Sequence, residues 1–365
     1  MSENKIIPAV RYVARVLLAL NLGTEPPALP DGVDYREVYK AAKRHSLSGA
    51  LWYALEDKVT PLGDRELIAV WSKERDVEFM QYYAQKTEYD KIVKRFGEEK
   101  IPYLAMKGCV IRELWARPEY RTMSDMDIYV SSEYSKEAKA VLLECGFSAE
   151  GDTAVHDNFF KAPYVKVELH RNIYRDAKDT YSDWLADEDN PYKYRMSDVD
   201  FLVFHVRHMY KHYGSGGCGV RPFFDTYLYL KNRAGNIDKD ELNDKLARHS
   251  LSDFYSLVEE IISLWFGEED ITPSQEALEA EYYIATGGVY GSLTNRVDRQ
   301  VKTKGKLSYF FNRTFLPYRD MKQIYKWLPR LPFLLPFAYV HRLLKALFDG
   351  RMKTELKAYK NRKKT

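Results

Sequence analysis

Apolar residues recur at spacings of three and four along the first hundred positions, which is the period of an α-helix. The first such stripe lies within residues 8–20 and is formed by Val10, Val13, Leu17 and Leu20. The same period predicts helices over residues 34–57 and 64–98. We therefore expect residues 1–99 to form a helical N-terminal region that flanks a later domain and carries no chemistry of its own.

The period changes at Ile101, where short apolar runs bounded by turn residues predict β-strands. The expected strands cover residues 101–106, 124–130, 147–149, 158–161 and 165–170, and the expected helices cover residues 109–116 and 133–145. Their order is β-α-β-α-β-β-β, which is typical of helices laid against one mixed sheet. We expect an α+β fold in which residues 100–195 form an α/β core.

Helical patterns return after Pro191, and residues 196–300 are expected to form a helical second lobe. His205, His208 and His212 share one face of the predicted helix over residues 199–212, because they lie three and seven positions apart. They either line a cleft opposite the sheet, pack in the core, or bind a metal ion. The glycine-rich loop 214–219 has no P-loop lysine and hydroxyl, so we interpret it as a connection that positions Arg221.

The charge is distributed unevenly along the 365-residue chain, whose net charge is +3. Residues 301–365 contain 17 Lys and Arg against 3 Asp and Glu, so the remainder of the chain is acidic. An amphipathic helix is expected over residues 337–359. This basic tail either contacts an anionic membrane surface or another partner, or packs on the acidic body of the protein. Nucleic acid is neither excluded nor favoured as a partner.

The three cysteines are widely spaced and show neither a metal-binding nor a disulfide pattern, which suits a reducing compartment. The N-terminus lacks the apolar segment of a signal peptide, and no apolar run is long enough to cross a bilayer. We expect a cytoplasmic protein.

Asp125 and Asp127 lie two positions apart on the expected strand 124–130, so both carboxylates point to the same face. Adjacent carboxylates resist joint ionisation unless a cation lies between them, and oxygen pairs of this kind bind Mg²⁺ together with substrate phosphates. A solvated turn at the start of a strand is the alternative. On the strand 165–170, Glu168 and His170 share a face by the same alternation.

These motifs resemble the nucleotidyltransferase core of the DNA polymerase β superfamily, and more closely its little-characterised bacterial branch, the uncharacterised nucleotidyltransferase family. The resemblance covers about residues 100–300. It is carried by Lys107-Gly108, Arg121, Asp125-Met126-Asp127, Glu168-Leu169-His170 and the histidine-rich segment 204–212. The superfamily's usual Gly-Ser pair is here Gly108-Cys109, so the phosphates are expected to be held differently, with Lys107 as a candidate.

The resemblance implies transfer of a nucleotidyl group from an NTP to an unknown hydroxyl-type acceptor, with two Mg²⁺ ions held by Asp125, Asp127 and Glu168. These three residues are also the expected catalytic residues, and Glu168 is expected to help remove the acceptor proton. The expected substrate-binding residues are Lys107, Gly108, Arg121, His156, His170, Arg221 and Asp225. The competing hypothesis is a non-catalytic nucleotide-binding or scaffold protein whose basic tail recruits a partner or a membrane.

Overall fold

The structure of the protein is a computed structural model that describes residues 3–153, 155–173, 184–269, 271–293, 295–297, 301, 305 and 315–348. The N-terminal region is helical, as the sequence predicts. Its helices are α1 (Glu3–Leu22), α2 (Tyr35–Arg44), α3 (Ser48–Val59) and α4 (Arg65–Glu98). Short 3₁₀ segments lie at Thr60–Leu62, Arg112–Leu114, Pro118–Tyr120, Ser132–Tyr134, Ala234–Asn236 and Pro332–Leu334.

One predicted helix, residues 34–57, is two helices in the structure. The break follows α2, where Ser46 adopts a left-handed backbone with φ of 53°. The neighbouring His45 is fully buried, and its Nδ1 accepts a hydrogen bond of 3.2 Å from the backbone N–H of Val220. The apolar period continues through the break because α2 and α3 both bury their apolar sides in the same core, so the sequence pattern alone does not reveal the turn.

Seven strands form one mixed sheet in the order β3-β4-β5-β2-β1-β7-β6. They are β1 (Tyr103–Ala105), β2 (Met126–Tyr129), β3 (Ser148–Asp152), β4 (His156–Lys161), β5 (Val165–His170), β6 (Leu185–Ala186) and β7 (Lys193–Arg195). The pairs β2–β5 and β1–β7 are parallel, and the other four are antiparallel. The predicted α+β fold with a mixed sheet is therefore confirmed, and β6 and β7 add two strands that the pattern did not indicate.

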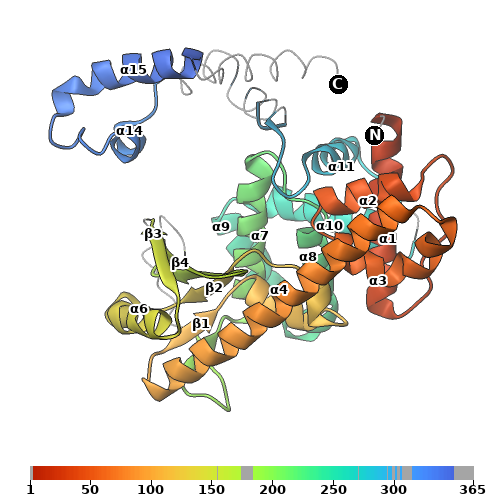
Figure 1. Cartoon of the computed structure of the whole chain (residues 1–365), viewed down its shortest axis with the longest axis horizontal. Coiled ribbons are helices and arrows are strands. Elements are labelled where there is room, and N and C mark those ends of the chain that lie inside the picture. The colour runs from red at the N-terminus through yellow and green to blue at the C-terminus, as the bar shows by residue number, and fades with distance from the viewer. Residues whose placement is uncertain are drawn as a thin grey trace.

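One face of the sheet is covered by α4 and by α6 (Ser135–Glu144), as Figure 1 shows. Alternate residues of the central strands, including Met126, Ile128 and Val167, are buried against these helices. Because successive strand residues point to opposite faces, Asp127 and Glu168 project from the other face, toward the helical lobe. The single-turn helix α5 (Gly108–Ile111) connects β1 to the segment before β2 and is shorter than predicted.

The helical lobe contains α7 (Asp198–Gly214), α8 (Arg221–Arg233), α9 (Lys239–Arg248), α10 (Ser252–Phe266) and α11 (Gln275–Gly287). Its apolar residues share one continuous core with α1, α2 and α3, so the N-terminal helices pack against the helical lobe although more than 130 positions of the chain lie between them (Figure 1). Arg11 of α1 forms a bidentate ion pair with the buried Glu281 of α11, with N–O distances of 2.8 and 2.7 Å. The predicted domain boundaries at residues 99, 195 and 300 stay predictions.

The C-terminal part that the structure describes forms α14 (Tyr318–Ile324) and α15 (Leu335–Phe348), which lie apart from the sheet in Figure 1. Met321, Leu328 and Ala338 form the centre of a small apolar cluster in this segment. The predicted helix 337–359 matches α15 up to Phe348, and its remainder lies outside the described residues. Within the described residues, every helix is too short or too polar to span a bilayer.

Candidate functional site

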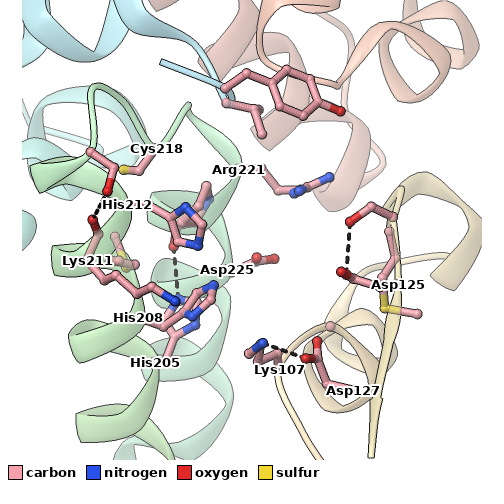
Figure 2. Close-up of a pocket in the computed structure, with 18 of the residues that line it drawn as sticks. Lys107, Asp125, Asp127, His205, His208, Lys211, His212, Cys218, Arg221 and Asp225 are labelled. Atoms are coloured by element: carbon pink, nitrogen blue, oxygen red, sulfur yellow. Dashed lines mark hydrogen bonds and ion pairs between the residues drawn. The ribbon is translucent and has the colours of Figure 1, made fainter. Parts of the chain in front are cut away.

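A cavity of about 450 Å³ lies between the exposed face of the sheet and the helices α7 and α8. It brings together residues that are far apart in the chain, from Lys107 to Arg296. Figure 2 shows Lys107, Asp125 and Asp127 on one side and the histidines of α7 on the other. The predicted site residues that line it are Lys107, Gly108, Arg121, Asp125, Asp127, His156, Glu168, Arg221 and Asp225. His170 lies directly behind this wall, bonded to Asp127.

The three carboxylates predicted to form a triad lie together. Asp125 directly precedes β2, Asp127 is on β2, and Glu168 is the residue that pairs with Asp127 on the parallel strand β5. Burial, together with the charges of Asp127 and Glu168, raises the pKa of Asp125 to about 6. Burial is the larger of these causes, and a cation between the carboxylates would relieve the repulsion that adds to it.

Asp127 is stabilised in its charged form even though burial alone would raise its pKa. Its Oδ1 accepts a hydrogen bond of 2.5 Å from Nζ of Lys107 and lies 2.8 Å from Nε2 of His170. Lys107 and His170 together hold the pKa of Asp127 well below its usual range. Although burial opposes it, the Asp127 carboxylate also raises the pKa values of Lys107 and of His170. Asp127 therefore remains charged, with the Lys107 ammonium group and the His170 imidazole both at one of its oxygens.

Lys107 and Gly108 form the tight turn between β1 and α5. Lys107 has a φ of 47°, and a Cβ on Gly108 would lie 2.4 Å from the sulfur of Met123 and 2.6 Å from Nη1 of Arg121. A larger residue there would require Met123 and the ion-paired Arg121 to shift. The backbone N–H groups of Cys109 and Val110 are already bonded to the carbonyl oxygens of Met106 and Lys107. This single turn therefore offers few free amides to a phosphate, which leaves the Lys107 side chain as the nearby cation.

Arg121 and Asp225 form a buried bidentate ion pair, with Nε–Oδ1 and Nη2–Oδ2 distances of 2.9 and 2.8 Å. The indole N–H of Trp115 donates to the same carboxylate over 3.0 Å. Burial would raise the pKa of Asp225, but the Arg121 guanidinium lowers it. Two nitrogens of Arg121 are thus already used, and the pair joins the sheet domain to α8. The structure places both residues at the cavity, where their observed contacts are with each other.

Arg221 lies at the start of α8 and points into the cavity (Figure 2). Its Nη1 donates to the carbonyl oxygen and to Oγ1 of Thr122, over 2.7 and 2.9 Å. Its buried Nε has no hydrogen-bond partner among the described residues. Burial, followed by the charge of Arg121, lowers the pKa of Arg221 to about 10. It is a buried cation with donor capacity left for an anion.

The histidine stripe on α7 lines the cavity, so the cleft alternative from the sequence is confirmed for His205, His208 and His212. The rings of His208 and His212 lie 4.4 Å apart, and burial lowers the pKa of both. Lys211 and Arg296 also line this wall but were not singled out from the sequence. Lys211 was detectable from its place beside His208 and His212 on the same helix, whereas no sequence pattern marks Arg296.

Two glycine-rich loops, residues 214–219 and 287–291, pack backbone against backbone at the edge of the cavity. A Cβ on Gly217 would lie 2.6 Å from the carbonyl oxygen of Gly288, and one on Gly291 would lie 2.7 Å from the carbonyl carbon of Gly216. The N–H of Ser292 donates to the carbonyl oxygen of Gly216 over 3.3 Å. The glycines are therefore required for this close approach, which places Tyr290 and Arg296 at the cavity.

The donor atoms around Asp127 and Glu168 fit two kinds of metal ion. Asp125, Asp127 and Glu168 offer the carboxylate oxygens that Mg²⁺ prefers. His156, Glu168 and His170 offer one donor atom each, and these three atoms lie within 4.8 Å of one another. Glu168 belongs to both groups, and it lies 3.4 Å from Nδ1 of His156 and 3.5 Å from Nε2 of His170.

Residues 31–267 match the model of a protein family described as uncharacterised nucleotidyltransferase. The chain has no match among curated proteins. Among solved structures, the chain is similar to the solution structure of the antibiotic-resistance factor ANT(2″)-Ia, at 12% sequence identity and a TM-score of 0.37. That similarity covers 48% of this chain and 96% of the other.

Proposed function

The chain belongs to the uncharacterised nucleotidyltransferase family, and we propose that it transfers a nucleotidyl group from an NTP to a hydroxyl-type acceptor. One observation carries the proposal: three carboxylates, one just before β2 and the others on the adjacent strands β2 and β5, meet at a cavity whose other walls carry Lys211, Arg221 and Arg296. An acidic wall suits divalent cations, and a basic wall suits the negative charge of a triphosphate.

In the proposed site, Asp125, Asp127 and Glu168 would hold two Mg²⁺ ions. The raised pKa of Asp125 and its burial beside two other carboxylates fit this role, because a cation would relieve their repulsion. When bound, such ions would neutralise charge on the transferred phosphoryl group and on the leaving pyrophosphate.

The protein's own residues would bind and orient the reactants. Lys107, at the turn before α5, and Arg221, with its unpaired Nε, are the cations proposed to contact phosphate oxygens. Glu168 is proposed to accept the proton of the acceptor hydroxyl as the acceptor oxygen bonds to the α-phosphorus and pyrophosphate leaves. His156 and His170 flank Glu168 and would fix the orientation of its carboxylate. The Arg121–Asp225 pair would hold the two walls of the cavity at a constant separation.

Calorimetry of Mg²⁺-dependent NTP binding tests this proposal. Asp125→Asn and Asp127→Asn should each abolish binding, because each removes a negative charge from the carboxylate group. Asp90→Asn is the matched control, since Asp90 is exposed on α4 and is ion-paired only with Lys86 in the described residues. Unchanged binding in either cavity variant would contradict the proposal. Incubation with labelled NTPs and cell extract would then identify the acceptor.

The alternative is a nucleotide-binding or scaffold protein without catalysis. Both versions require the cavity to bind a nucleotide, so binding does not separate them. Metal-dependent release of pyrophosphate in the presence of a pool of acceptors does: transfer produces it, and simple binding does not.

A contact between the C-terminal tail and a membrane is a second, independent proposal. Its basis is α15, whose residues Phe337, Val340, Leu344 and Phe348 are exposed and recur at helical spacing on one side. Basic residues in the same segment, including Lys345, favour an anionic surface. The alternative that the tail packs on the protein body would leave this face covered.

A further inference from the structure

We propose that His156, Glu168 and His170, with Asp127 beside them, form a site for a divalent transition-metal ion such as Zn²⁺, distinct in chemistry from an all-oxygen Mg²⁺ site. The inference deepens the proposed function and rests on it in one respect: of the two ions proposed there, the one at Glu168 would be a transition-metal ion in place of Mg²⁺. The binding of the metal itself does not require that nucleotidyl transfer occurs.

The strand register brings these residues together. His156 is the first residue of β4 and pairs directly with His170 on the antiparallel strand β5. Glu168 lies two positions before His170 on the same face, and it pairs with Asp127 on the parallel strand β2. Three adjacent strands therefore deliver two imidazoles and two carboxylates to one side of a rigid sheet.

The separations of the donor atoms match those around a small metal ion. Zn²⁺ bonds of about 2.0–2.2 Å in a tetrahedral site place neighbouring donor atoms about 3.3–3.6 Å apart. Nδ1 of His156 lies 3.4 Å from Oε2 of Glu168, and Nε2 of His170 lies 3.5 Å from that same oxygen. Direct hydrogen bonds would be shorter, and the structure has none between Glu168 and His156 among the described contacts. Two of the three separations thus fit a small metal ion, and the two histidine nitrogens lie within 4.8 Å of each other.

An unsatisfied nitrogen provides a second observation. Nδ1 of His156 is buried and has no hydrogen-bond partner among the described residues, although it faces the carboxylate of Glu168. A buried polar atom without a partner is costly, and a cation between this nitrogen and the carboxylate would satisfy both. A purely structural role for the histidine pair leaves that nitrogen unexplained.

The choice of ion follows from the donor types. Imidazole nitrogen favours Zn²⁺ and its transition-metal neighbours, whereas Mg²⁺ takes oxygen ligands almost exclusively. Asp125, which has no imidazole partner in the described contacts, would remain available for an oxygen-bound ion that accompanies the NTP. Nδ1 of His170 also lacks a partner among the described residues, so the outer support that usually strengthens a metal-binding histidine is incomplete. We therefore expect an exchangeable ion.

Cobalt(II) absorption spectroscopy tests the proposal on the full-length protein without any measurement of activity. Co²⁺ replaces Zn²⁺ in such sites, and imidazole-containing sites of low coordination number give a strong visible band. Titration of the metal-free protein should produce this band, and added Zn²⁺ should remove it, whereas excess Mg²⁺ should not. In the His156→Gln variant the band should be lost. His156 is the better choice for substitution, because its side chain is partly exposed and His170 is buried.

Asp125→Asn separates this proposal from the proposed function. The Asp125→Asn variant should keep the cobalt band and lose Mg²⁺-dependent NTP binding. The His156→Gln variant should lose the cobalt band. An Asp125→Asn variant that still binds Mg²⁺·NTP would contradict the proposed function and leave the metal site intact. A cobalt band of equal strength in the wild-type protein and in His156→Gln, or no band in the folded wild-type protein, would overturn the inference drawn here.

Discussion

Nζ of Lys107 lies 2.5 Å from Oδ1 of Asp127 and donates a hydrogen bond to it. The two residues come from neighbouring antiparallel strands, Lys107 just after the end of β1 and Asp127 within β2. The lysine therefore supplies at Asp127 the positive charge that a metal ion would bring. An ion that binds to this oxygen competes with the ammonium group, and this competition leads to the first prediction.

Lys107→Met should destabilise the metal-free protein, because it removes the ammonium group from the buried Asp127 carboxylate and leaves the His170 imidazole as its side-chain partner in the described contacts. Removal of one partner from a buried ion pair costs about 3 kcal/mol. Divalent cations should restore much of the lost thermal stability, since they occupy the same position. Thermal melts with and without Mg²⁺ or Zn²⁺ measure both effects. Lys211→Met, on the opposite wall, is the control and should show neither; an equal response of the two variants would exclude the competition.

The pH dependence of metal binding should follow Asp125, whose pKa is raised from 3.8 to about 6. Protonation of this carboxyl competes with a cation, so the affinity for Mg²⁺·NTP should fall as the pH decreases through about 6. The effect on folding stability has the opposite sign. Because its pKa is raised, the Asp125 carboxyl favours the folded state in its protonated form, so its contribution to the free energy of unfolding decreases as the pH rises from 3.8 through about 6. Calorimetry at pH values from about 5 to about 8, a range that includes this pKa, measures the affinity for Mg²⁺·NTP. A flat profile would contradict the assignment.

The ion pair between Arg121 and Asp225 should be important for stability. Both side chains are buried, so Arg121→Met should leave an uncompensated carboxylate and reduce the free energy of unfolding by about 3–5 kcal/mol. Arg36→Met is the matched control, because Arg36 forms the same bidentate arrangement with Asp64 at the exposed surface. Its loss should be much smaller, since water screens exposed pairs. Urea denaturation of both variants provides the comparison, and similar losses would contradict the expected effect of burial.

Gly217→Ala should destabilise the protein, since the new methyl group would lie 2.6 Å from the carbonyl oxygen of Gly288. Relief of this clash requires the two glycine loops to move apart, at a cost of about 1–3 kcal/mol. Because the loop 287–291 carries Tyr290 at the cavity, nucleotide affinity should also decrease. Gly235→Ala is the control, as a Cβ there meets no atom within 4 Å. Denaturation measures the stability of the two variants, and calorimetry measures their nucleotide affinity. Equal stability and equal affinity in both variants would contradict the role of the loop contact.

Sedimentation with liposomes tests the membrane contact of the tail. The wild-type protein should bind vesicles that contain anionic lipid more strongly than neutral vesicles, because the segment combines exposed apolar residues with positive charge. Replacement of Phe337 and Leu344 by serine should reduce this binding, since both side chains are exposed on α15. Leu62→Ser, at an exposed position outside the tail, is the control. If anionic lipid does not change sedimentation, the tail does not act in this way.

Local patterns in the sequence were sufficient for most elements. The helical period identified α4 and α7 almost to their ends and the central part of α1, which begins five residues before the predicted stripe, and alternation identified the faces of β2 and β5. The alternation also placed Glu168 and His170 on the same side, since side chains two apart on a strand always share a face. The sequence thus determined the α+β fold class, the family and the group of carboxylates. These properties depend on short-range geometry and on residue types.

The partners of these residues depended on the tertiary structure. No spacing in the chain shows that Arg121 pairs with Asp225, which is 104 positions away, or that Arg296 reaches the same cavity. Nor does spacing show that the apolar run 34–57 breaks at Ser46, because both halves are buried in one core. Strand order brings His156 beside His170, and only that pairing places two imidazoles at Glu168. Contacts between distant segments depend on how the whole core packs, so the sequence determined the chemical groups and the tertiary structure decided their neighbours.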